Sequence, residues 1–151
     1  MAGKGIGARL LRKEDDRHLQ GRGRFVGDMA PAGMKEVAFV RSPVAHARIR
    51  RIVKPKGAED RVFTFADLTG VKLIRAISKL PTYKPSDYPV LATGKVRFVG
   101  EPIALCVGDT RAEAEDLAQE VVVDFEDLPP VADMLKARQP GSALVHEQWG
   151  S

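Results

Sequence analysis

The sequence is poor in cysteine and in aromatic residues. Its 151 residues include one cysteine, and the aromatic fraction is 6%. A single cysteine excludes a disulfide framework within the chain and favours a cytoplasmic protein. No apolar run reaches the roughly eighteen residues of a membrane-spanning helix. Residues 1–11 are basic and have no apolar stretch, so we expect no secretory signal there.

The rest of the composition is typical of a folded domain. Hydrophobic residues make up 44% of the chain and charged residues 29%, which is enough apolar surface for a core of small aliphatic side chains. The length fits one domain. We find no internal repeat and no segment of low complexity.

The net charge of +4 is concentrated at the N-terminus. Residues 1–24 hold three acidic residues against seven basic ones, which are Lys4, Arg9, Arg12, Lys13, Arg17, Arg22 and Arg24. Residues 1–28 are therefore predicted to form a basic, irregular arm. Such an arm can bind an anion or reach a neighbouring subunit. Proteins that bind single-stranded nucleic acid stack the bases on several aromatic side chains, and this arm has one, Phe25. We expect neither nucleic acid nor membrane as a partner.

Strands and one loop follow from the pattern of apolar residues. Apolar or alternating runs predict strands at residues 37–40, 45–50, 62–64, 96–99, 103–107 and 121–125. Residues 69–95 contain Pro81, Pro85 and Pro89 and are predicted to be a long surface loop. Residues 133–137 are expected to form a short helix.

One helix has a clear start. Thr110 and Glu113 have the spacing of a capping box, and one apolar stripe follows at Ala114, Leu117, Ala118 and Val121. Residues 103–125 thus read as a strand–helix–strand unit, for which a right-handed parallel crossover is the most economical arrangement. The predicted fold class is α+β, with a mixed sheet containing this unit.

No residue stands out as a reactive group. Cys106 lies inside an apolar strand, which favours a buried thiol over a nucleophile. His18, His46 and His146 are too widely spaced for a local metal motif, and His46 is expected to be a hydrogen-bonded, half-buried residue. Glu101, in the turn Gly100–Pro102, is the most constrained acid of the chain.

Two further segments favour structural roles. The glycine-rich segments 3–7 and 21–24 neither follow a strand nor open a helix, so they do not match a phosphate-binding loop. The acidic run 14–16 is expected to be solvated or ion-paired. The sequence therefore predicts no catalytic, cofactor-binding or metal-binding residue in this chain.

Several stretches in order resemble one family. They are Ile6–Gly7, Arg12–Asp15, Leu19–Asp28, Pro31–Met34, Ala38–Pro43, Ala45–Ile49, Val96–Ala104, Ala114–Asp116, Val121–Glu126 and Leu128–Val131. Together they are similar to the opening of the large subunit of molybdenum hydroxylases, the group of xanthine dehydrogenase, aldehyde oxidase and aerobic carbon monoxide dehydrogenase. The resemblance runs over residues 6 to about 147. It implies the α/β hammerhead domain of this family at residues 29–137, with residues 138–151 leading toward a molybdenum-binding core absent from the sequence.

The resemblance also implies a function. The family oxidises its substrates with a molybdopterin cofactor and passes the electrons to iron–sulfur clusters and FAD. None of the family's catalytic residues falls in the matched region, so these groups are expected on partner chains and none in this chain. The chain would then be a hammerhead domain or split subunit of an oxidoreductase, not catalytic alone. Two alternatives stay open: a stand-alone binding module that uses its basic arm, or a truncated fragment without function.

Overall fold

The structure is a computed structural model that describes residues 5–8 and 11–149. The chain divides into two compact units, Met1–Met34 and Lys35–Ser151. The described part of the first unit buries no residue. It contains the short helix α1 (Asp15–Leu19) and the 3₁₀ turn η1 (Val26–Asp28). The expected irregular arm thus contains one short helix in its described part.

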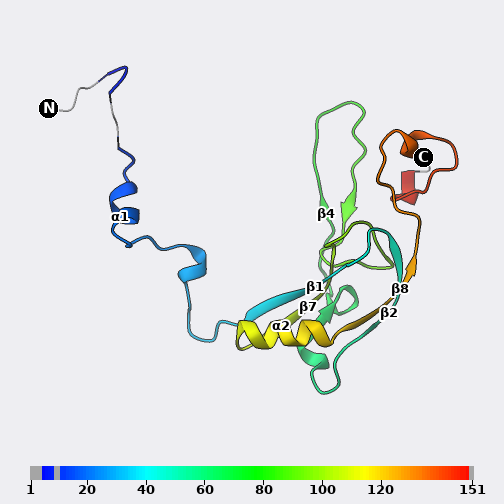
Figure 1. The fold of residues 1–151 in the computed structure, drawn as a ribbon, viewed down its shortest axis with the longest axis horizontal. Helices are drawn as coiled ribbons and strands as arrows, with labels where there is room; N and C mark the ends of the chain where they lie inside the picture. Colours follow the sequence, from blue (N-terminus) through cyan, green and yellow to red (C-terminus); the bar gives the residue numbers. More distant parts are fainter. Residues whose placement is uncertain (1–4, 9–10, 150–151) are drawn as a thin grey trace. The chain divides into compact units, whose positions relative to one another are not determined.

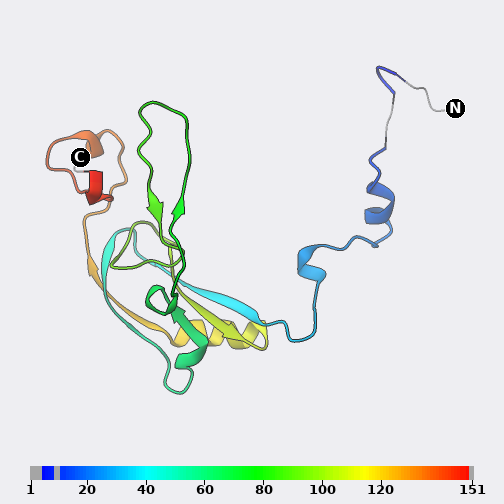
Figure 2. The same ribbon diagram turned by 180° about the vertical axis from the view of Figure 1, so that it is seen from behind.

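The second unit contains two three-stranded sheets and a hairpin (Figures 1 and 2). The first sheet has the order β1 (Glu36–Arg41), β7 (Pro102–Gly108), β3 (Val62–Thr64). The second has the order β6 (Lys95–Val96), β2 (Ala47–Val53), β8 (Val122–Asp127). The hairpin pairs β4 (Ile74–Arg75) with β5 (Asp87–Tyr88). The remaining 3₁₀ turns are η2 (Glu59–Arg61), η3 (Phe65–Asp67), η4 (Lys136–Arg138) and η5 (Glu147–Trp149).

The predicted helix is confirmed as α2 (Arg111–Glu120), which packs on β1 and β7 (Figure 1). The Thr110 hydroxyl accepts a hydrogen bond from the Glu113 backbone N–H at 3.2 Å. The Glu113 carboxylate in turn accepts from the Asp109 backbone N–H at 2.9 Å. The first bond satisfies the Glu113 N–H in the first turn of the helix, and the second satisfies the Asp109 N–H just before the N-cap. Ala114 and Leu117 are buried, as the stripe predicted.

Strand β7 contributes to two hydrophobic clusters, one on each of its faces. Ala104 and Cys106 belong to a cluster with Leu117 and Val121, under α2. Ile103, on the opposite face, is fully buried in a second cluster with Ala47, Ala92 and Val96 of the other sheet region. The expectation that residues 103–107 form a buried strand is confirmed at Ile103, Ala104 and Cys106, whereas Leu105 and Val107 are half-buried.

The predicted parallel crossover is wrong. Strands β7 and β8 lie in different sheets, and every strand pairing in the described part of the chain is antiparallel. The reason is that β7 is a central strand, whose two edges are already occupied by β1 and β3. The chain leaving α2 therefore pairs with β2 instead. The expected mixed sheet is replaced by two antiparallel ones.

Other element boundaries differ from the prediction. The segment 69–95 is not an irregular loop throughout, because it contains the β4–β5 hairpin. Arg75 fixes this hairpin by donating two hydrogen bonds to the Asp87 carboxylate, both at 2.6 Å. The strand expected at 96–99 is only Lys95–Val96, since the chain turns toward Gly100, whose φ of 89° suits glycine. Residues 133–137 give way to the 3₁₀ turn η4, and β2 begins at Ala47 rather than Ala45.

No helix in the described ranges combines the length and the apolar character needed to cross a bilayer.

Gly108 should tolerate no side chain. A Cβ there would lie 2.7 Å from the Ala114 backbone nitrogen and 2.9 Å from the Thr110 carbonyl oxygen. We expect Gly108→Ala to lower the free energy of unfolding by about 1–3 kcal/mol through overpacking of the β7–α2 turn. Gly27→Ala is the control, because a Cβ there meets no atom within 4 Å. Urea unfolding at an unchanged m-value measures both, and equal stability of the two variants would contradict this packing.

Candidate functional site: a buried polar cluster

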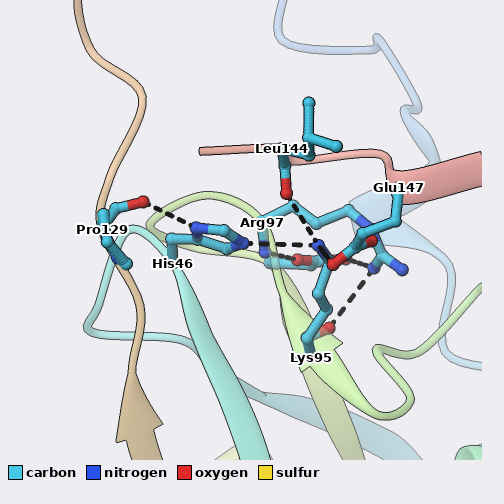
Figure 3. Close-up of polar contacts among 7 residues, drawn as sticks. His46, Lys95, Arg97, Pro129, Leu144 and Glu147 are labelled. Atoms are coloured by element: carbon cyan, nitrogen blue, oxygen red, sulfur yellow. Dashed lines mark hydrogen bonds and ion pairs between the residues drawn. The ribbon is translucent and has the colours of Figure 1, made fainter. Parts of the chain in front are cut away.

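Buried polar side chains of the second unit form a cluster, and Figure 3 shows His46 and Lys95 of this cluster with their partners. Among the described residues, the buried polar or charged ones are Ser42, His46, Lys95 and Glu101. They come from the turn between β1 and β2, from β6 and from the turn before β7. Burial of charge is costly unless each group is paired, so the contacts of these residues decide what the cluster can do.

Glu101 is 2% exposed and is held by Arg97. One carboxylate oxygen accepts from the Arg97 backbone N–H, and the other accepts from the Arg97 guanidinium at 3.1 Å. The Arg97 guanidinium also donates to the Lys95 carbonyl at 3.3 Å. The backbone of Glu101 accepts from the Ser42 N–H at 2.9 Å, and Gly100 N–H donates to the Ser42 carbonyl at 2.8 Å. Glu101 therefore joins the β1–β2 turn to the turn before β7.

Lys95 uses all three of its ammonium protons. Its Nζ lies 2.7 Å from Glu147 Oε1, 3.3 Å from the Leu144 carbonyl oxygen and 3.4 Å from His46 Nε2 (Figure 3). An ammonium has three donors and no acceptor. The Lys95 side chain is 9% exposed, and no donor remains for a further ligand.

These contacts indicate the tautomer of His46. Its Nδ1 lies 2.8 Å from the Pro129 carbonyl oxygen, and because a carbonyl only accepts, Nδ1 carries the proton. Its Nε2 accepts from Lys95 and is therefore unprotonated. His46 is hydrogen-bonded, as the sequence predicted, and it is buried rather than half-buried. It lies one residue before β2, and its carbonyl accepts from Leu128 N–H at 2.9 Å.

The C-terminal segment closes the cluster. Glu147 and Leu144 both contact Lys95, and the ring of His146 lies 4.6 Å from that of Trp149. The hydrogen bond from Lys95 holds the pKa of the Glu147 carboxyl below its ordinary value. Burial, followed by the positive charges of Arg97 and Lys95, lowers the pKa of His146. Residues 144–149 are thus held onto the sheet by charge and hydrogen bonds.

The remaining sequence candidates lie elsewhere. Cys106 is fully buried, and burial raises the pKa of its thiol, as expected for a structural cysteine. His18 belongs to the first unit and stacks on Phe25 at a centroid distance of 5.5 Å. The segment 21–24 follows α1, and of segment 3–7 the first two residues lie outside the described ones. In the acidic run, Asp16 accepts from the Gln20 side chain at 2.6 Å.

Sequence reasoning missed three members of the cluster. Lys95, Arg97 and Glu147 lie on short or irregular segments without periodicity, and their partners are 49 or more residues away for two of them. Nothing local marks a lysine whose charge will be buried. The sequence did indicate Glu101, because an acid between Gly100 and Pro102 has little conformational freedom, and it indicated His46 as a hydrogen-bonded residue.

The residues present do not fit a metal or an iron–sulfur cluster. Within residues 5–8 and 11–149, no group of three or more His, Cys, Asp or Glu side chains could hold a metal ion. Iron–sulfur clusters take four cysteine thiolates or a similar ligand set, and this chain has one cysteine.

Comparison with known proteins identifies the class. Residues 20–129 match the family model described as "Aldehyde oxidase and xanthine dehydrogenase, a/b hammerhead domain". The chain belongs to this family of oxidoreductases, as the sequence resemblance indicated. The α+β hammerhead fold is confirmed.

Particular relatives show how much of the family this chain represents. It is 34% identical to the carbon monoxide dehydrogenase large chain of Hydrogenophaga pseudoflava and 38% identical to the nicotine 6-hydroxylase large subunit of Paenarthrobacter nicotinovorans. Each match covers 95% of this chain and 18% of the relative. The quinoline 2-oxidoreductase structure from Pseudomonas putida 86 matches with a TM-score of 0.81 and 38% identity, over 92% of this chain and 18% of that one. The chain spans less than a fifth of these relatives.

Docking of residues 144–149 should weaken in acid. The folded-state pKa values of His146 and Glu147 both lie below their ordinary values of 6.5 and 4.5. Each of the two residues therefore stabilises the docked segment fully above its ordinary pKa. This stabilisation is lost as the pH falls from that value through the lower pKa of the folded state. Trp149 is the one tryptophan of the sequence, so its fluorescence reports on this segment.

We expect the Trp149 emission to shift to longer wavelength as the pH falls below about 6.5, and further below about 4.5. In Glu147→Gln the second step should disappear, because no carboxyl remains to be protonated. Emission that stays constant down to about pH 3, in a protein still folded by circular dichroism, would contradict this docking.

Proposed function

We propose that this chain is the hammerhead part of a molybdopterin-dependent oxidoreductase and that its role is structural, beside the chain that carries the molybdenum. The observation that carries the proposal is the closed polar cluster. Glu101 is paired by Arg97, and each proton of Lys95 has an acceptor. In the described part of the chain, every buried side-chain nitrogen and oxygen has a hydrogen-bond partner. The cluster thus has no group left over for a substrate.

The same proposal assigns the domain limits. Residues 29–137 form the hammerhead domain, and residues 138–151 lead toward the molybdenum-binding part of the enzyme. The segment from Leu144 to Glu147 contacts Lys95, which supports a fixed direction for the chain as it leaves the domain. The protein is a split subunit of the enzyme or a segment of its large chain.

The cofactors belong, in this proposal, to other parts of the complex. Molybdopterin, iron–sulfur clusters and FAD reside in those other parts. For the iron–sulfur clusters this is supported by the single cysteine of the sequence and by the lack, among the described residues, of any group of three His, Cys, Asp or Glu side chains that could hold a metal. The relatives include proteins named for carbon monoxide and for nicotine as substrates. The reaction of the complex, in this proposal, is the hydroxylation of a carbon centre or the oxidation of carbon monoxide, carried out in the cytoplasm.

The N-terminal unit supports a contact with another subunit. Its described residues are all at least partly exposed, and Leu19, Phe25 and Val26 expose 66–88% of their surface beside Arg22 and Arg24. A segment with apolar and basic side chains and no core of its own gains its order from a partner. Should the chain act instead as a stand-alone binding module, this arm would grip an anionic partner, and its binding would weaken steeply with salt.

Purification of the chain from its native host tests the proposal. We expect larger polypeptides to co-purify, with molybdenum and iron detectable in the same fractions by mass spectrometry of the metals. The control is the chain expressed alone, which should be folded and free of both metals. A native preparation in which the chain elutes by itself, folded and without metal, would contradict the structural role and leave salt-dependent binding as the next test.

A further inference from the structure

Two cations lie side by side on the β6–β2–β8 sheet, on the face away from the core. The strand register places Arg48 of β2 directly opposite Lys95 of β6. Their neighbours Ala47 and Val96 belong to the core, and because side chains alternate along a strand, Arg48 and Lys95 point to the other face. Like charges directly opposite one another destabilise a sheet. The Arg48–Lys95 pair therefore needs an anion beside it.

Glu147 is the anion that this pair receives. Its carboxylate lies 2.7 Å from Lys95 Nζ. The hydrogen bond from Lys95 is the main cause that lowers the pKa of the Glu147 carboxyl, and the positive charge of Arg48 acts in the same direction. On its other side Arg48 lies opposite Glu126, whose carboxylate is 3.4 Å from Arg50. Arg48 takes part in none of the ion pairs formed among the described residues, so it adds an unmatched positive charge beside Lys95.

Lys95 is oriented by a residue other than Glu147. His46 Nε2 accepts one ammonium proton, and the His46 ring is itself held by the Pro129 carbonyl oxygen. The other two protons are directed to Leu144 and Glu147, as Figure 3 shows. The lysine thus keeps its direction when Glu147 leaves, and a donor that is already oriented binds an anion without a further ordering cost.

The segment that supplies Glu147 is held by few polar contacts. In the described part of the chain, every hydrogen bond between residues 144–149 and the rest of the protein comes from Lys95. The Glu147 side chain is 57% exposed, whereas that of Lys95 is 9% exposed. Solutes therefore reach the carboxylate while the lysine stays covered. A segment with so few contacts opens at a low cost in free energy, and its release frees two protons of Lys95.

We propose that Arg48 and Lys95 form a binding site for a carboxylate, which Glu147 occupies in this structure and from which the carboxylate of a ligand displaces it. The site is additional to the structural role proposed above and does not depend on it. The ligand class follows from the group already seated there: a planar carboxylate can accept from the ammonium with one oxygen and from the guanidinium with the other. Ligand binding and docking of residues 144–149 then exclude each other.

Titration with sodium acetate, a minimal carboxylate, tests the site. The full chain and its Glu147→Ala variant are titrated at neutral pH, and sodium chloride at the same ionic strength controls for screening. The amide chemical shifts of residues 46–48 and 95–97 report binding, and the emission of Trp149 reports release of residues 144–149. A blocked glycine–glutamate–glycine peptide is titrated in parallel, because the natural carboxylate could belong to a free acid or to a protein segment.

We expect Glu147→Ala to bind acetate saturably and about tenfold more tightly than the wild type, in which the tethered carboxylate competes. In the wild type, binding should shift the Trp149 emission to longer wavelength. Adding Arg48→Gln to Glu147→Ala should weaken binding by about threefold or more, because one of the two cations is lost. Adding Arg51→Gln, the same change at another exposed arginine of β2, should leave the affinity within about twofold.

All three positions are exposed, so the variants should fold, which circular dichroism checks. Should Glu147→Ala fail to fold, the wild-type titration with and without Arg48→Gln decides in the same way. Acetate that shifts no amide beyond the effect of chloride overturns the site, as does an equal loss of affinity in both arginine variants. Equal affinity of the wild type and Glu147→Ala overturns the claim that Glu147 occupies the site.

The two carboxylate probes distinguish the sources of the ligand. Tighter binding of the peptide assigns the site to an acidic side chain of a protein segment, and tighter binding of acetate assigns it to a free acid. None of these measurements requires a molybdenum-binding chain, so a failure of the carboxylate site leaves the proposed function standing.

Discussion

The buried ion pair between Arg97 and Glu101 is the interaction on which the second unit depends. Glu101 is 2% exposed, and its carboxylate is engaged by the backbone and the guanidinium of Arg97. Its own backbone is bonded to Ser42. Glu101, which directly precedes β7, thus connects the residues that follow β1 and β6. A buried pair of this kind adds little net free energy, but the loss of one partner leaves an uncompensated charge. We therefore expect few substitutions to be tolerated at either position.

The surfaces of the second unit differ in what they contact. At the polar cluster, Lys95, which also contacts His46, binds Glu147 of the chain's own C-terminal segment. The β1–β7–β3 sheet carries α2 on one face and leaves Phe39 and its neighbours uncovered on the other. While the C-terminal segment is docked, the groups that could do chemistry are therefore used to hold the structure. This arrangement agrees with the structural role that we propose for the domain.

Sequence reasoning predicted the elements whose signals are local. The α2 helix followed from Thr110, Glu113 and the apolar stripe, and β7 from an unbroken apolar run. The sheet arrangement could not be predicted in the same way, because it depends on which strands occupy the two edges of β7. Lys95 and Glu147 were missed for a related reason: they are 52 residues apart, and neither carries a local pattern. Glu101 could be singled out because its turn restricts it, but its partner Arg97 could not.

The most direct test is the stability of a Glu101→Ala variant, compared with Glu126→Ala, whose carboxylate forms an exposed pair with Arg50 at 3.4 Å. The account predicts that Glu101→Ala loses about 2–3 kcal/mol of unfolding free energy, because the Arg97 backbone N–H and its half-buried guanidinium lose their acceptor. Glu126→Ala should lose about 1 kcal/mol or less. Glu101→Gln, which keeps the shape and removes the charge, should fall between these values. A Glu101→Ala protein as stable as the wild type would contradict the claim that this pair holds the fold together.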